Sequence, residues 1–141
     1  MTRNGQVLEF RLGEETYCVS IDVVTEIVDV GEVTSVPNAP AHVQGVMDLR
    51  GRTTAIVDPR VVFDLDTETD PRRIVVFDPD VVEDQSAAGW LVDEVHQVVD
   101  ADPETLDETA VADDDSLKGV RKRDDGSFVI WVDPQAVHAA G

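Results

Sequence analysis

The chain has little cysteine, few lysines and few aromatic residues, and it has no long apolar run. Its single cysteine, Cys18, excludes an intramolecular disulfide, and we expect a reducing, cytoplasmic setting. No apolar stretch approaches the roughly 20 residues that a membrane-spanning helix needs, so no membrane insertion is predicted. The N-terminal residues MTRNGQVLEF lack the apolar centre of a signal peptide, and we expect none.

Positive charge is also scarce. Lys and Arg number 11 against 30 Asp and Glu, which leaves a formal net charge of -19. Phosphate binding needs clustered cations, so nucleic acid is excluded as a general partner. Apolar segments recur along the whole chain, which favours a folded protein over a disordered one. An acidic, lysine-poor surface is typical of proteins from salt-adapted prokaryotes, where dissolved salt screens the self-repulsion.

The apolar residues that are present alternate with polar ones or form short buried runs. This period of two is typical of strands, and no amphipathic helix of ten or more residues can be drawn. Glycine and proline separate the runs, and no fixed-period repeat is evident. The pattern therefore predicts an all-β barrel or sandwich. The expected strands are 7–12, 16–21, 45–49, 53–58, 74–78, 88–95, 117–123 and 127–133.

Motifs for catalysis or cofactor binding are missing. The chain contains no GxSxG sequence and no glycine-rich phosphate-binding loop. The three histidines lie far apart, and the acidic loop 64–70 lacks the glycine and the final glutamate of a calcium loop. Cys18 lies within a strand and is expected to be a small buried residue. We therefore predict no catalytic residues, no metal and no cofactor.

One chemical alternative concerns Asp78. It follows the apolar run IVVF, as the phosphoacceptor aspartate does in a response-regulator receiver domain. That fold is doubly wound and needs amphipathic helices between its strands, and no such helices are predicted here. A strand-end aspartate is more often the first residue of a turn.

A basic triplet, Arg121, Lys122 and Arg123, stands out near the C-terminus. One interpretation is a charged strand edge that discourages aggregation. The other is an electrostatic contact for an acidic partner. The triplet is therefore a candidate for a partner-facing contact.

Several segments together resemble the CheW family, the coupling proteins of chemotaxis signalling. Gly45, Val46, Leu49, Arg50 and Gly51 match its G-V-x-x-L-R-G turn, and Ile56-Val57-Asp58 matches the strand end that follows. The resemblance extends over nearly the whole chain. The other matching segments are FRLGEETYCVSIDVVTEIV (10–28), VPNAPAHVQGV (36–46), GWLVDEVHQVV (89–99) and LKGVRKRDDGSFVIWVDPQAVH (117–138).

The resemblance implies a single domain over 1–141, built of two SH3-like five-stranded barrel lobes packed on a shared core with short helical turns. The expected lobes are 16–66 and 73–132, with the N-terminal strand crossing between them. It also implies a non-enzymatic adaptor that couples chemoreceptors to the histidine kinase CheA. The implied partners are the regulatory domain of CheA and the cytoplasmic tip of a methyl-accepting chemotaxis protein. The adaptor would be cytoplasmic and recruited to receptor arrays at the membrane. The alternative is a CheW-like scaffold for another two-component kinase.

The same resemblance assigns a receptor-binding groove. Glu26 and Arg50 are expected to form an ion pair near it, because a guanidinium can bind a carboxylate through two hydrogen bonds. Whether Arg50 contacts the receptor or only holds its loop remains open. Arg52 and Arg60 are expected only to counter the acidic surface locally. The candidate apolar anchors for a receptor helix are Val24, Ile27, Val36 and Val46.

Overall fold

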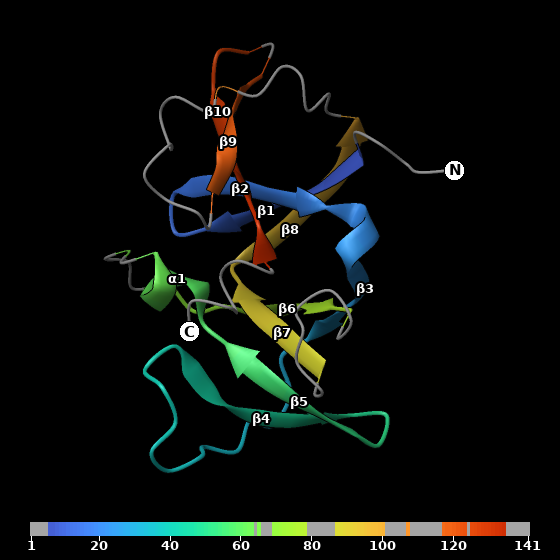
Figure 1. Ribbon diagram of the computed structural model, residues 1–141, viewed down its shortest axis with the longest axis vertical. Helices are drawn as coiled ribbons and strands as arrows, with labels where there is room; N and C mark the ends of the chain where they lie inside the picture. The colour runs from blue at the N-terminus through green and yellow to red at the C-terminus, as the bar shows by residue number, and fades with distance from the viewer. Residues whose placement is uncertain are drawn as a thin grey trace.

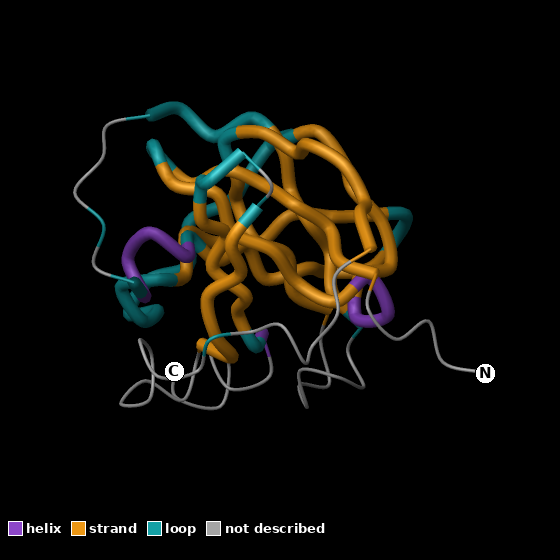
Figure 2. Tube along the Cα trace, turned by 90° about the horizontal axis from the view of Figure 1, so that it is seen from above, coloured by secondary structure: helices purple, strands orange, loops and turns teal. Residues whose placement is uncertain are grey.

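The structure, a computed structural model, consists of two stacked lobes, each built on a five-stranded β-sheet (Figure 1). It describes residues 6–63, 65, 69–78, 87–100, 107, 117–123 and 125–134. Seen from above, the strands follow a rounded outline with short helices at its margin (Figure 2). The all-β class and the two five-stranded lobes predicted above are therefore confirmed.

The first sheet, sheet A, has the strand order β8-β1-β2-β10-β9. Neighbouring strands are antiparallel except β2 and β10, which are parallel. Its strands are β1 (Gln6–Leu12), β2 (Glu15–Ser20), β8 (Glu94–Asp100), β9 (Leu117–Lys122) and β10 (Phe128–Val132).

The second sheet, sheet B, has the order β3-β6-β7-β5-β4. Here β5 and β7 form the single parallel pair. Its strands are β3 (Val24–Asp29), β4 (Val43–Leu49), β5 (Arg52–Val57), β6 (Arg73–Phe77) and β7 (Ala87–Val92). Two short helices complete the described elements, namely η1 (Ile21–Val23) and α1 (Pro59–Val62).

The strands group differently from the expected lobes at 16–66 and 73–132. Sheet A combines β1 and β2 with the three C-terminal strands, whereas sheet B takes β3 to β7. The chain passes from one sheet to the other after β2 and again after β7. Pairings between segments this far apart depend on the burial they achieve together, which local periodicity does not reveal.

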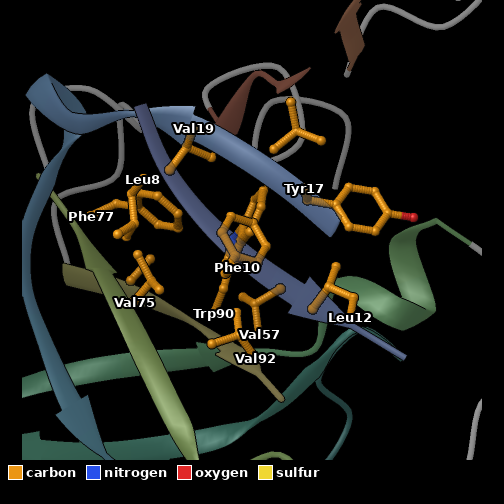
Figure 3. Packing of buried hydrophobic residues seen from close by; sticks show 12 residues of the cluster. Leu8, Phe10, Leu12, Tyr17, Val19, Val57, Val75, Phe77, Trp90 and Val92 are labelled. Atoms are coloured by element: carbon orange, nitrogen blue, oxygen red, sulfur yellow. The ribbon is translucent and has the colours of Figure 1, made fainter. Parts of the chain in front are cut away.

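The period of two along β1 divides its side chains between two interiors. Leu8, Phe10 and Leu12 enter a core that both sheets share, while Val7 and Glu9 face the interior of the sheet A lobe. Figure 3 shows the shared core, in which side chains of β1 and β2 meet those of sheet B. A separate small cluster around Met47, Ile56, Ile74 and Val76 fills the sheet B lobe.

Trp90 lies at the centre of the shared core and is fully buried. Its ring meets Phe77 edge-on at 4.8 Å between centroids and Phe10 at 6.4 Å. Phe63, at the end of α1, contacts Trp90 at 6.2 Å and stacks on Tyr17 of β2 at 5.6 Å. The residue after α1 therefore bridges the two sheets.

Arg60 is not a surface counter-charge, and the expectation above is wrong. Its guanidinium binds both oxygens of Asp58, from Nε at 3.0 Å and from Nη2 at 2.9 Å. Hydrogen bonding to the Asp58 side chain raises the pKa of Arg60. Its Nη1 donates to the carbonyl and the hydroxyl of Thr69, at 2.9 and 2.8 Å. Since Asp58 also caps the start of α1, Arg60 ties the helix to the segment that leads into β6.

We expect Trp90→Ala to destabilise the fold strongly, because it removes the ring that both sheets pack against. Large-to-small core substitutions of this kind cost about 3–5 kcal/mol of unfolding free energy. Urea unfolding followed by circular dichroism measures the loss. Phe128→Ala is the matched control, because the Phe128 side chain is exposed and such surface changes stay within about 0.5 kcal/mol. Equal losses in the two variants would contradict a shared core centred on Trp90.

Candidate functional site

The candidate site lies where the two edge strands of sheet B meet. Glu26 on β3 and Arg50 at the end of β4 form an ion pair, with 3.5 Å between Oε1 and Nη2. β3 and β4 are the outermost strands in the sheet order, so the pair joins opposite edges of one sheet. The ion pair implied by the family resemblance is thus formed.

Arg50 has an unusual backbone conformation. Its φ is 54°, and the φ of Gly51 is 82°. The two residues form the whole loop between β4 and β5. A two-residue hairpin loop with positive φ at both positions has the backbone signature of a type I′ turn, for which Asn-Gly is the preferred sequence. Arginine at the first position is therefore held in a left-handed conformation that side chains of its kind seldom adopt.

Two opposing energies decide whether Arg50 stabilises the folded turn. The left-handed conformation costs about 1–2 kcal/mol for a residue with a Cβ. The ion pair with Glu26 returns little, because the Arg50 side chain is 82% exposed and exposed pairs contribute about 0–1 kcal/mol. The turn would therefore be at least as stable without this arginine. Strain that stability does not explain favours a role in contacting a partner.

The four apolar candidates do not share one environment. Val24 packs against the shared core and is partly buried. Ile27 and Val36 are exposed, at 40% and 43%. Val36 lies in the loop between β3 and β4, where a turn through Pro37 and Asn38 follows it. Ile27 and Val36 are thus the apolar side chains of this set that a partner can reach.

Val46 lies beside an open hollow of about 470 Å³ on the sheet B lobe. Its backbone N–H and carbonyl pair with Thr34, at 2.9 and 2.8 Å, which fastens the β3–β4 loop onto β4. Gly45 permits this approach, because a Cβ at that position would lie 2.1 Å from the Thr34 carbonyl oxygen. The hollow is lined by Gly31, Glu32, Thr34, Val46, Met47, Asp48 and Thr53.

The basic triplet is mostly internal. Arg121 Nη2 lies 2.6 Å from Oε2 of Glu9, and Arg123 Nη2 lies 2.8 Å from Oε1. Glu9 is 1% exposed, so the sheet A lobe encloses a carboxylate between two guanidinium groups. Lys122 is the triplet residue with an exposed side chain. Glu9 was not predicted as a buried partner, because its only signal in the sequence is a polar residue between two apolar ones in a strand.

The surroundings of Asp78 do not fit a receiver domain, and Cys18 is buried as expected. Asp78 follows β6, which lies between antiparallel neighbours, whereas a receiver domain needs a parallel sheet. The interpretation of Asp78 as the phosphoacceptor of a receiver domain is therefore wrong. Burial raises the pKa of the Cys18 thiol to about 12, so this cysteine stays protonated and is a poor nucleophile.

The described residues contain neither a cluster of metal-ligating side chains nor a membrane-spanning helix. Within them, no group of three or more His, Cys, Asp or Glu side chains could hold a metal ion. Asp64, Asp66 and Glu68 of the acidic loop, and His138, lie outside the described residues. In the same part of the chain, no helix has the length and apolar character to span a membrane.

Comparison with known proteins gives consistent matches. The profile of the CheW-like domain family matches residues 6–140. A chemotaxis protein CheW from Thermotoga maritima is 30% identical over 131 residues, which cover 91% of this chain and 83% of that protein. Another from Helicobacter pylori is 30% identical over 128 residues, covering 85% of this chain and 73% of that protein.

Among solved structures, the scaffolding protein TtCheW from Thermoanaerobacter tengcongensis superposes with a TM-score of 0.82. The match covers 97% of this chain and 89% of that one, at 24% sequence identity. At this identity, the likeness supports the fold alone.

We expect Arg50→Asn to leave the fold as stable as before, or to stabilise it by up to about 1 kcal/mol. Asparagine tolerates the left-handed conformation and completes the preferred Asn-Gly turn, while only an exposed ion pair is lost. Chemical unfolding of both proteins at the same salt concentration measures the difference. Arg50→Val is the control, because a β-branched residue should strain the same turn. A loss of more than about 1 kcal/mol in Arg50→Asn would mean that the arginine supports the fold.

Proposed function

This chain belongs to the CheW-like domain family, and from that premise we propose that it is a non-enzymatic adaptor of chemotaxis signalling. In this role it couples chemoreceptors to the histidine kinase CheA. The relatives that cover most of the chain are chemotaxis proteins CheW, and the matched family spans residues 6–140. The adaptor acts in the cytoplasm and is recruited to receptor arrays at the membrane.

The observation that carries the receptor contact is the turn at Arg50. Its guanidinium is 82% exposed and lies 3.5 Å from Glu26, so most of its donors face solvent. A planar guanidinium binds a carboxylate or a carbonyl oxygen through directed hydrogen bonds. The receptor ligand we propose is therefore an acidic or amide side chain at the cytoplasmic tip of a chemoreceptor.

Apolar contacts complete the proposed receptor surface. Ile27 lies on β3, the same strand as Glu26, and Val36 lies in the loop that leads from β3 to β4. Both side chains are exposed. A helical hairpin docks its own apolar side chains, at helical spacing, into an apolar groove, and these two residues would supply apolar contacts for them. Val24 and Val46 support that surface from partly buried positions.

The proposed kinase partner is the regulatory domain of CheA, which the family resemblance implies. Lys122 is the exposed member of the basic triplet and stays a candidate for an electrostatic contact with an acidic partner. Arg121 and Arg123 are already bound to Glu9. A contact through the triplet would therefore act through Lys122.

We expect the purified protein to bind both a receptor-tip fragment and the regulatory domain of a cognate CheA. Arg50→Asn should weaken receptor binding by at least tenfold and leave kinase binding unchanged, because the turn is preserved and only the guanidinium is removed. Calorimetry in molar potassium chloride measures both affinities, with circular dichroism as the check on folding. Arg52→Asn is the matched control, since Arg52 is an exposed arginine on the same hairpin.

Four outcomes are informative. Loss of receptor binding in Arg50→Asn alone supports both the adaptor and its site. Binding of both partners with full affinity by Arg50→Asn keeps the adaptor and refutes the site. A folded wild-type protein that binds neither partner would refute the coupling role, and binding to a different two-component kinase would favour the alternative scaffold.

We further propose that the acidic surface is adapted to high salt. A net charge of -19 opposes the compact state through self-repulsion, and salt screens it as the Debye length falls from about 10 Å at 0.1 M to about 3 Å at 1 M. The midpoint of thermal unfolding should therefore rise by several degrees between these concentrations of potassium chloride. A midpoint that falls or stays constant would refute the adaptation.

A further inference from the structure

The two sheets repeat one strand plan. In each, two antiparallel pairs are followed by one parallel pair and then by one antiparallel pair. A row of paired residues crosses each sheet and ends on a glycine. The row in sheet A is Gln97, Glu9, Cys18, Trp131 and Gly119, and the row in sheet B is Glu26, Val76, Gly89, Ile56 and Gly45.

Other details agree with this correspondence. The valine after each glycine forms an isolated bridge to the preceding loop, Val46 with Thr34 and Val120 with Asp107. A Val-Asp-Pro sequence ends β5 at 57–59 and ends β10 at 132–134. The chain therefore consists of two related units, 6–63 and 73–134, with one strand order.

Each lobe draws strands from both units. Sheet A holds β1 and β2 of the first unit beside β8, β9 and β10 of the second. Sheet B holds β3, β4 and β5 of the first unit beside β6 and β7 of the second. The units have exchanged their first two strands. Because the strand plan is the same, β1–β2 and β6–β7 could each fit either lobe on backbone geometry alone.

The side chains at equivalent interior positions differ in chemistry. Glu9 corresponds to Val76 in the two rows. Two residues beyond the row glycines, Arg121 corresponds to Met47, and two further on, Arg123 corresponds to Leu49. The sheet B lobe thus has three apolar side chains where the sheet A lobe has a carboxylate between two guanidinium groups.

We propose that the ion set Glu9, Arg121 and Arg123 selects which strand pair enters which lobe. Glu9 belongs to the first unit and both arginines to the second, so the set is complete only when β1 lies in sheet A. If β1 entered the sheet B lobe, Glu9 would face Met47 and Leu49. If β6 entered the sheet A lobe, Val76 would face two unpaired guanidinium groups.

Both wrong assemblies bury an unpaired charge, which is strongly destabilising. Apolar side chains at the three positions would pack about as well as the ion set does. The charges therefore contribute discrimination between the two assemblies more than they contribute stability. The side-chain exposures fit this role, at 1% for Glu9, 15% for Arg121 and 27% for Arg123. Charges this far from solvent are weakly screened by salt.

A co-refolding experiment with full-length chains tests this pairing rule. One copy carries Glu9→Val, and the other carries Arg121→Met together with Arg123→Leu. Each copy alone must leave a charge unpaired in its sheet A lobe. When the two copies exchange β1 and β2, one lobe becomes wholly ionic and the other wholly apolar, so both are matched.

We expect the yield of heterodimer from the mixture to be at least tenfold above the yield of homodimer from either copy refolded alone. The copies carry different affinity tags, are mixed in urea, diluted into molar potassium chloride and analysed by tag capture and light scattering. The triple variant, with all three substitutions in one chain, leaves no charge unpaired but no longer distinguishes β1–β2 from β6–β7 by charge. It should therefore refold to a smaller native fraction than the wild type and show no excess of heterodimer.

The control uses an exposed ion pair that also joins the two units. Arg11 and Glu94 lie 3.1 Å apart on β1 and β8, with side chains 39% and 60% exposed. A copy with Arg11→Met and a copy with Glu94→Leu should not form a heterodimer on mixing. The charge left unpaired in each copy is hydrated by solvent, so exchanging strands gains little. Equal heterodimer yields in both mixtures, no heterodimer in the Glu9 mixture, or a triple variant that refolds to the native fraction of the wild type would each overturn the proposal.

Discussion

The structure depends on burial of one apolar layer between two sheets that are each also curved around an interior of their own. A strand that faces both the shared layer and the interior of its own lobe must divide its alternate side chains between them. β1 does so with Leu8 and Phe10 on one side and Val7 and Glu9 on the other. Trp90 lies at the centre of the layer and contacts side chains from both sheets. This arrangement couples the lobes, because neither sheet can bury its shared face without the other.

The lobes have the same strand plan but use their charged residues differently. In the sheet B lobe, the pair Glu26–Arg50 lies at the surface, and its arginine is held in a strained turn where a partner can reach it. In the sheet A lobe, arginines from β9 and the residue after it turn inward to Glu9. The shared strand plan is thus compatible with the partner contact proposed for the sheet B lobe and with the pairing rule proposed for the sheet A lobe.

Part of this could be predicted from the sequence. Period-two alternation identified the strand at 7–12, and the Arg-Gly pair at 50–51 identified a tight turn. The family resemblance supplied the pairing of Glu26 with Arg50. The roles of Arg60 and the basic triplet could not be predicted, because a charge on a strand is a surface charge or a buried partner depending on what faces it. Arg121 and Glu9 are separated by 112 positions in the chain.

The sequence by itself determined the all-β class, the turn at residues 50–51 and the acidic surface, because these follow from neighbouring residues and from composition. Only the tertiary structure decided which strands pair and which charges are buried. Strands of two similar units can pair in more than one way, and each arrangement satisfies the same local periodicity. The choice depends on the total burial and on the pairing of Glu9 with its two arginines, which exist only once both units have come together.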